Sequence, residues 1–422
     1  MTTAKMTPGA HASSSEKAIS SRTILLSPID AWFFRDGRPY NSGESNQTDV
    51  ASLFPPPATT VVGALRAGLA REKGWDGVSN WSTQRKLADV LGDGFEGKKA
   101  LGAMRFRGPW LVRRQDGGAY ESLFPMPLHV LGKPGPKQSR DDGSCDHDKP
   151  YGSNEPIWQP QCLLTPADEK NATSCDLGDV RLPMTSSVRA HPFEKDGLKE
   201  PSSQWVTQPG LKLILSGQLP TQEHVVEARD LWKHEIRVGL KRNEEKRVTE
   251  QGGLYSPRFV RLARDVSLAM TVNDLPEDWH IPKLLALGGE GRMADCSPIA
   301  GWALCASPAK DHRRFTVTLL TPLMLPIDPD GTVRQPVIGQ ELPGLTGSRI
   351  VSACVGKSHS IGGWDSTKRQ PLPLRPVLPA GSTWFCECDA KDWPSLSQKH
   401  GQHIGDKRPF GYGQIVLGNW PQ

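Results

Sequence analysis

The stretch "TILLSPIDAWFFRDGRPYNSGE" (residues 23–44) joins an apolar segment to a loop rich in charge and glycine. Its first part alternates and then becomes continuously apolar, which predicts a core strand bent at Pro28. The strand leads into Arg35, Asp36, Gly37 and Arg38 directly after two phenylalanines. Two arginines and a glycine directly after a core strand indicate a loop that binds a ligand.

The segments that follow predict the order strand, helix, strand. A helix is expected after "FPPPATT" because Val62, Leu65 and Leu69 recur at helical spacing, and Gly74 can end it. Residues 103–112, "AMRFRGPWLV", are then expected to form a strand. Further along, "FTVTLLTP" and "STWFCEC" are apolar segments, and a last strand is expected near "QIVLGN".

The length of 422 residues fits two domains, and 42 Gly with 37 Pro indicate many turns and long connections. Strands that carry helices on one face through crossover connections predict an α+β fold with two ferredoxin-like halves and antiparallel sheets. We expect a loose tail at residues 1–22, a first domain at 23–205, and a second at 206–422. The first domain contains a long loop insertion at about residues 132–176, which is rich in Pro, Gly, Asp, Ser and Lys.

Composition favours an intracellular protein. The eight cysteines are sparse for this length and follow no secretory apolar segment, so we expect reduced thiols and a cytoplasmic location. No apolar run is long enough to cross a bilayer, so no membrane partner is expected. The net charge of +5 is too small to establish a polyanionic partner, and local clusters of charge have to decide that question.

The strongest such cluster is "KHEIRVGLKRNEEKR" (residues 233–247), which contains six Lys or Arg and three Glu. The segment "QGGLYSPRFVRL" follows it and adds an aromatic ring and further arginines. Cations interleaved with an aromatic residue suit single-stranded RNA, because cations bind phosphates and rings stack on bases. A solvated charged loop is the alternative. The candidate RNA-binding residues here are Arg237, Lys241, Arg242, Tyr255 and Arg258.

Two glycine-rich segments could also approach a phosphate, since glycine leaves backbone N–H groups accessible. "ALGGEGRMA" (residues 286–294) is either a turn that places Arg292 on a ligand or only a turn. "GDKRPFGYGQIVLG" (residues 405–418) places two cations among glycines before a strand, and its alternative is an ordinary β-hairpin turn. The candidates in this loop are Gly405, Lys407, Arg408, Gly411 and Gly413.

Signs of catalysis are weak. The sequence contains no HExxH, no paired CxxC, no GxSxG and no Gly-Gly-Asp-Asp run. Cys145, His147, Cys162 and Cys175 could bind zinc, but their spacing matches no strong pattern and free thiols are favoured. His234 could act as a general base on an RNA 2′-hydroxyl, although a histidine without a placed partner is more often structural. We expect no catalytic residue, no metal site and no cofactor.

The ordered segments together resemble a known family. "SPIDAWFFRDGRPYNSGE" followed by "LFPPPATTVVGALRAGLA" is similar to the N-terminal signature of the third subunit of the Cmr complex, a type III-B CRISPR RNA-guided effector. "EIRVGLKRNEEKRVTEQGGLYSPRFVRL", "LGGEGR", "RPVLPAGSTWF" and the glycine-rich C-terminal loop resemble later blocks of that family in the same order. The resemblance covers most of residues 23–418 and leaves out the tail and the insertion.

This resemblance implies an RRM-related RAMP protein that performs no chemistry in antiviral defence against foreign RNA. It would bind the 5′ repeat-derived tag of the CRISPR RNA and dock the large polymerase-like subunit, the backbone subunits and other RAMP subunits, with target RNA contacted indirectly. Arg35 and Arg38 would then reach phosphates of the tag, with Asp36 orienting one guanidinium. Arg66 belongs to the same block, and contact with a partner subunit is its alternative. The sequence lacks an aromatic RNP motif, so binding should depend on loops and the glycine-rich turn.

Two other classes of function remain open. Some RAMP relatives process precursor CRISPR RNA without metal by aligning the 2′-hydroxyl, so an endoribonuclease is one alternative. A zinc-stabilised protein-interaction module centred on the insertion is the other.

Overall fold

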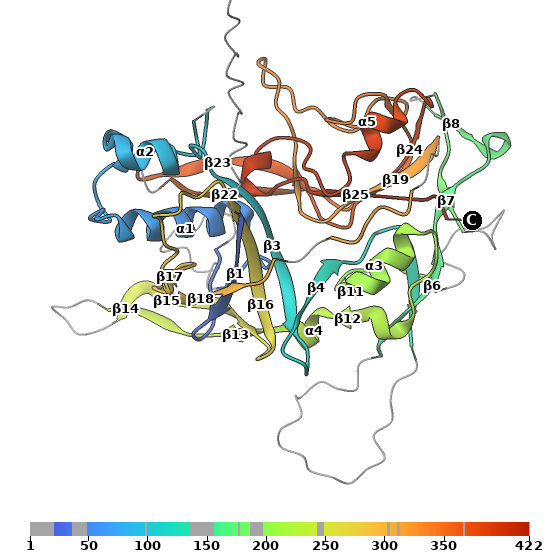
Figure 1. The fold of residues 1–422 in the computed structure, drawn as a ribbon. Coiled ribbons are helices and arrows are strands. Elements are labelled where there is room, and N and C mark those ends of the chain that lie inside the picture. Colours follow the sequence, from blue (N-terminus) through green and yellow to red (C-terminus); the bar gives the residue numbers. More distant parts are fainter. Residues whose placement is uncertain are drawn as a thin grey trace, which may run out of the picture.

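The computed structural model describes residues 21–35, 49–97, 99–135, 156–175, 178–185, 197–242, 249–301, 304–309, 313–365 and 368–421. This part of the chain forms several sheets and few helices (Figure 1), which confirms the α+β class. Strand neighbours are antiparallel except for one short parallel pairing.

The largest sheet has eight strands in the order β12-β11-β4-β3-β16-β1-β18-β17. It contains β1, the strand that the opening stretch predicts, which ends at Pro28. It also contains the strand predicted near residues 103–112, which is β3. Its bounds are β1 Ser21–Pro28, β3 Arg105–Arg114, β4 Tyr120–Pro125, β11 Gln204–Thr207, β12 Val225–Glu227, β16 Val266–Asn273, β17 Leu284–Ala286 and β18 Met293–Ile299.

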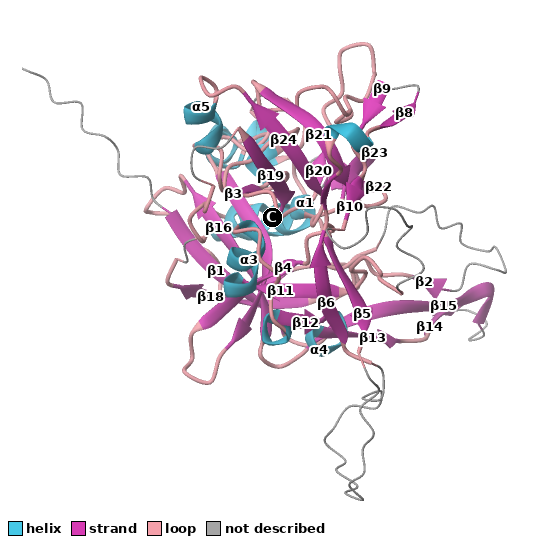
Figure 2. Cartoon of the chain, turned by 90° about the vertical axis from the view of Figure 1, so that its right-hand side faces the viewer, coloured by secondary structure: helices cyan, strands magenta, loops and turns pink. Residues whose placement is uncertain are grey.

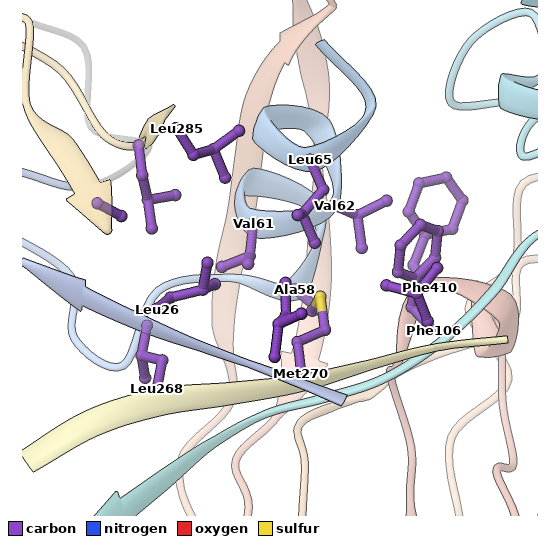
Figure 3. Packing of buried hydrophobic residues seen from close by; sticks show 14 of the residues in the cluster. Leu26, Ala58, Val61, Val62, Leu65, Phe106, Leu268, Met270, Leu285 and Phe410 are labelled. Atoms are coloured by element: carbon purple, nitrogen blue, oxygen red, sulfur yellow. The ribbon is translucent and has the colours of Figure 1, made fainter. Parts of the chain in front are cut away.

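Helix α1 (Ala58–Glu72) covers one face of this sheet, as the helical spacing of its apolar residues predicts. Val61, Val62 and Leu65 are fully buried and face sheet residues such as Leu26 and Met270 (Figure 3). Burying each such side chain stabilises the fold by about 1.5–3 kcal/mol, so this face anchors the helix.

The second sheet belongs to the C-terminal part and has the order β21-β24-β19-β25. Its bounds are β19 Arg314–Leu319, β21 Ser348–Cys354, β24 Thr383–Cys388 and β25 Ile415–Gly418. One face packs beneath α5 (Trp393–Ser397) around a core that includes Phe315, Trp384 and Trp393. Helix α3 (Gln208–Leu215) and β25 pack on the other face of the eight-stranded sheet, so the two sheets share a core.

Smaller sheets surround these two. Strands β13 (Trp232–Ile236), β14 (Gly239–Arg242) and β15 (Thr249–Leu262) form an arm that extends from the body (Figures 1 and 2), with β2 (Asp49–Val50) paired parallel to β15. The remaining elements are α2 Arg85–Leu91, α4 Ala228–Leu231, β5 Val130–Pro134, β6 Trp158–Leu163, β7 Thr165–Pro166, β8 Thr173–Cys175, β9 Gly178–Val180, β10 Pro183–Met184, β20 Leu323–Met324, β22 His359–Asp365 and β23 Gln370–Leu378.

The predicted insertion at 132–176 is not loop throughout. Its described parts include β6, β7 and β8, and Trp158 of β6 is buried in the shared core. The eight-stranded sheet also takes strands from residues 225–299, which the division at 205/206 assigns to the second domain. That division stays a prediction. Among the described residues, no helix has the length and apolarity that a membrane span requires.

Candidate nucleic-acid interface

Four segments that are distant in the sequence meet beside the end of β1. The Asp30 carboxylate accepts hydrogen bonds from Nη2 of Arg237 and Nη2 of Arg261, both at 2.8 Å, and from Nη1 of Arg292 at 3.0 Å. Glu235 accepts from Nε of Arg237 at 2.7 Å and Nε of Arg261 at 2.6 Å. We call these five residues the arginine cluster.

Strand pairing explains why the cluster forms. Side chains two residues apart on a strand share a face, so Glu235 points to the same side as Arg237. In the antiparallel pairing of β13 with β15, Glu235 lies opposite Phe259, which shares its face with Arg261. The backbone of Trp32, which follows β1, exchanges two hydrogen bonds with the backbone of Val260 on β15, at 2.9 and 2.7 Å. This pairing brings the chain after β1, including Asp30, beside the arm.

The "LGGEGR" turn positions Arg292 beside Asp30. The N–H of Gly289 donates to the carbonyl of Phe33 at 2.8 Å. Gly288 has φ +91°, and a Cβ there would stand 2.7 Å from that same carbonyl oxygen. Glycine is therefore required for the turn to approach Phe33 so closely. The sequence left two interpretations of this segment open, and the structure has a tight turn that aims Arg292 into the cluster.

Phe259 lies under the cluster and orients two of its guanidiniums. The guanidinium carbons of Arg237 and Arg292 lie 4.8 and 4.5 Å from the Phe259 ring centroid, within cation–π range. The Phe33 ring packs against Phe259 at 5.4 Å between centroids. The ring thus holds two cations in fixed positions at the surface.

The cluster stays ionised at neutral pH. The hydrogen bond from Arg237 lowers the pKa of Asp30 to about 2, against the cost of desolvation, with Arg261 adding to the effect. The hydrogen bond from Arg261 likewise lowers the pKa of Glu235. The same contacts raise the pKa of Arg237, through Asp30 first, and of Arg261, through Glu235 first. Three guanidiniums and two carboxylates leave an excess of one positive charge.

The cluster is open to solvent. The side chains of Arg292, Arg237 and Arg261 are 24%, 30% and 46% exposed. Each guanidinium carries five N–H donors, and the carboxylates use only one to three contacts on each. Nε of Arg292 is buried, but further donors at the accessible ends of these partly exposed side chains can bind an anion such as a phosphate group.

Arg66 does not belong to this surface. Its side chain is buried, its guanidinium donates to the carbonyls of Gly94 at 2.9 Å and Ala100 at 3.0 Å, and it lies 5.3 Å from the Trp81 ring centroid. Burial lowers its pKa to about 10. The buried guanidinium therefore holds Gly94 and Ala100 from inside, and the RNA-binding role of Arg66 stays a prediction to which this position gives no support.

The glycine-rich loop is also mostly internal. Nζ of Lys407 donates to Oε2 of Glu96 at 2.7 Å and to the carbonyl of Phe95 at 2.9 Å, and its side chain is 9% exposed. A Cβ on Gly411 or Gly413 would stand 2.2 Å or 2.1 Å from a backbone oxygen. The loop packs the C-terminal part against α1 and β3, and its role in binding phosphate stays a prediction. Gly405 is half-buried, and Arg408 alone among the five candidates is exposed.

The other candidates are scattered or fall outside the described residues. Arg35 and Arg258 are exposed, and Arg258 lies on β15 opposite Ile236, on the face of the arm turned away from Glu235. Arg38, with Asp36 and Gly37, lies outside the described residues, as do the side chains of Lys241, Arg242 and Tyr255.

Neither alternative site gains support from the described residues. His234 is exposed on β13, opposite Val260. Cys175 is exposed and Cys162 half-buried, while Cys145 and His147 lie outside the described residues. Within the described ranges, no group of three His, Cys, Asp or Glu side chains is placed to hold a metal ion.

Sequence reasoning missed four members of the site: Asp30, Glu235, Phe259 and Arg261. The alternation in "HEIRVG" and "PRFVRL" could have suggested them, since it places Glu235 with Arg237 and Phe259 with Arg261 once the strands pair. Nothing local identifies Asp30, whose partner Arg261 is 231 residues away.

The chain is similar to known CRISPR-associated proteins along most of its length. A family model described as "CRISPR-associated protein (Cas_Cmr3)" matches residues 24–420. The fold is similar to a chain in a structure of the type III-B Cmr-beta complex bound to cognate target RNA, with 14% identity, TM-score 0.44, and coverage of 94% of this chain and 99% of that one. The same complex with AMPPnP gives 15% identity, TM-score 0.41 and 86% coverage of both chains. A chain of the Csm3–Csm4 subcomplex of type III-A gives 11% identity, TM-score 0.35, and 94% and 99% coverage. No curated protein matches.

Proposed function

The chain belongs to the Cas_Cmr3 family of CRISPR-associated proteins, and we propose that it is the third subunit of a type III-B CRISPR effector, the Cmr complex. In this role it binds the 5′ repeat-derived tag of the CRISPR RNA. It docks the large polymerase-like subunit, the backbone subunits and other RAMP subunits onto that end, and target RNA is contacted indirectly. The complex acts in the cytoplasm as a defence against foreign RNA.

One observation carries this proposal. The opening stretch, "EIRVGLKR", "PRFVRL" and "LGGEGR" are blocks that resemble the family, and each contributes a residue to the arginine cluster. Asp30 and Glu235 hold the guanidiniums in place, and further N–H donors of these partly exposed side chains remain for a ligand. Preorganised arginines of this kind suit RNA phosphates, because a planar guanidinium binds two oxygens of one phosphate.

We propose further that the two main sheets belong to two ferredoxin-like units. In the larger sheet, the strands β18-β1-β16-β3 run in the order fourth, first, third, second along the chain when the other strands are set aside. In the second sheet, β25-β19-β24-β21 run in the same order. All these neighbours are antiparallel. A split βαβ arrangement produces this order, which supports two ferredoxin-like, RRM-related units.

We propose that the subunit catalyses no step itself. A general acid or base works best with a pKa near the working pH. The carboxyls of the arginine cluster have lowered pKa values and their partner guanidiniums stay protonated. The cluster is therefore suited to binding an anion and not to transferring a proton.

To test this, the protein is isolated from its native host through an affinity label, under mild salt. Co-purifying proteins are identified by mass spectrometry and bound RNA is sequenced. A large polymerase-like subunit, several RAMP proteins and short RNAs with a common 5′ repeat tag are expected. Recovery of the chain alone, without RNA, would refute the assembly role.

A further inference from the structure

The hairpin of β22 and β23 exposes apolar side chains that the arginine cluster does not use. Trp364 is 61% exposed and Leu374 is 53% exposed, and Val355, just before the hairpin, is 41% exposed. The opposite face of the hairpin is buried through Ile361 and Val377. The hairpin lies on the other side of α1 from β13 and β15 (Figures 1 and 2). It is therefore a surface separate from the cluster.

The indole ring of Trp364 has an apolar side chain beside it on the same face of the hairpin. Gly362 and Gly363 precede Trp364, whose cross-strand neighbour is Pro371. A Cβ on Gly362 would stand 3.0 Å from Cδ2 of Leu374. Residues two apart on a strand share a face, so the Leu374 side chain, which covers Gly362, lies on the same face as Trp364. A base that stacks on the indole ring would also contact this leucine.

The exposed charges on the described part of this hairpin are all positive. Lys357, Lys368 and Arg369 are exposed. Asp365 is the only acidic residue between 355 and 378, it is 7% exposed, and it accepts a hydrogen bond from the backbone N–H of Lys368 at 3.1 Å. The adjoining loop after α2 contributes Asp93 and Glu96, of which Glu96 is bound by Lys407 at 2.7 Å.

We propose that the outer face of the β22–β23 hairpin is a second contact for single-stranded RNA. Trp364 stacks on a base, and Lys368 and Arg369 in the adjoining turn bind the phosphates next to it. Lys357, before the other end of β22, binds a phosphate a few nucleotides away. An aromatic platform flanked by cations recognises single strands with little regard to sequence, because every base has a π-face. This contact goes beyond tag binding, since it requires no particular RNA sequence. The strand of seven residues provides about 20 Å of surface, enough for a few nucleotides.

The test uses the full-length chain and a fluorescein-labelled oligouridine of eight nucleotides, with anisotropy measured from 50 to 300 mM salt. Trp364→Ala should weaken binding about 5-fold to 10-fold, and Trp364→Phe should stay within about 2-fold of the wild type. Lys368→Gln with Arg369→Gln should reduce the salt slope by about 1.4, as expected for two phosphate contacts on a single strand. Matched controls are Leu219→Ala, at an apolar side chain that is 37% exposed, and the exposed pair Lys170→Gln with Lys212→Gln.

Three results would overturn the proposal. They are unchanged affinity of Trp364→Ala, no binding by the wild type at 50 mM salt, and equal losses in the control variants. If Trp364→Ala keeps its RNA affinity but fails to co-purify with other subunits, the hairpin docks protein. Failure of tag binding is a separate result: RNAs with an authentic and a scrambled tag would bind equally well, while Trp364→Ala would still weaken both.

Discussion

Substituting Gly411 by alanine should destabilise the protein far more than an ordinary loop glycine would. Gly411 has φ +105°, and a Cβ there would stand 2.2 Å from the carbonyl oxygen of Gly108 on β3. The positive φ costs alanine about 1–2 kcal/mol. The clash with backbone adds about 1–3 kcal/mol, because two packed segments have to separate. The free energy of unfolding should therefore fall by about 2–5 kcal/mol.

Gly331→Ala is the matched control, because Gly331 has φ +88° but a Cβ there would meet nothing within 4 Å. It carries only the conformational cost, about 1–2 kcal/mol. Urea unfolding followed by tryptophan fluorescence measures both variants, and equal slopes would verify that the same structure unfolds. If Gly411→Ala costs no more than Gly331→Ala, the account of this loop as a packing junction is refuted.

Three further predictions concern charged residues. Asp30 has a folded-state pKa of about 2 against an ordinary 3.8. The stability that its ionised carboxylate adds to the folded state is therefore complete above about pH 4 and is lost as the pH falls toward 2. Asp30→Asn should thus lower the free energy of unfolding by about 1 kcal/mol at pH 7. If the difference in this free energy between wild type and variant were as large at pH 2.5 as at pH 7, the prediction would be contradicted. Lys407→Met should cost about 1 kcal/mol in urea unfolding because it removes the bonds to Glu96 and Phe95, whereas the exposed Arg408→Gln should cost under about 0.5 kcal/mol. Equal costs would show that Lys407 is not held inside. Arg237→Gln with Arg292→Gln should weaken tag binding by the purified complex about 10-fold or more and flatten its salt dependence. Arg85→Gln with Arg105→Gln, at two exposed arginines outside the cluster, should change tag binding under about 2-fold.

The elements that sequence predicted well are those whose signal is local. Helix α1 follows from the spacing of Val62, Leu65 and Leu69, all fully buried, and β1 and β3 follow from their apolar runs. The pairing of β1 with β16 and β18 could not be predicted this way, because it joins residues about 250 positions apart.

The glycine-rich loop shows why a local pattern can mislead. Glycine suits a phosphate loop and a close backbone contact for the same reason, the missing Cβ. Gly411 and Gly413 use that space for protein backbone. The partner that removes Lys407 from solvent is Glu96, 311 residues away, so the sequence around the lysine contains no sign of it.

Arg237 and Arg292 were identified from sequence because each stands in a basic or glycine-rich segment. The local segments could not indicate that both arginines bind the Asp30 carboxylate and stack on the Phe259 ring. Such a cluster arises only when β13, β15 and the turn before β18 are brought together by the fold.

Binding of the 5′ tag at the arginine cluster can be tested by ultraviolet cross-linking of the CRISPR RNA within the complex purified from its host, with the linked peptides identified by mass spectrometry. We expect nucleotides of the 5′ tag to cross-link to peptides containing Arg237, Phe259 or Arg292. Tag cross-links confined to other surfaces of the chain, or to other subunits alone, would contradict it.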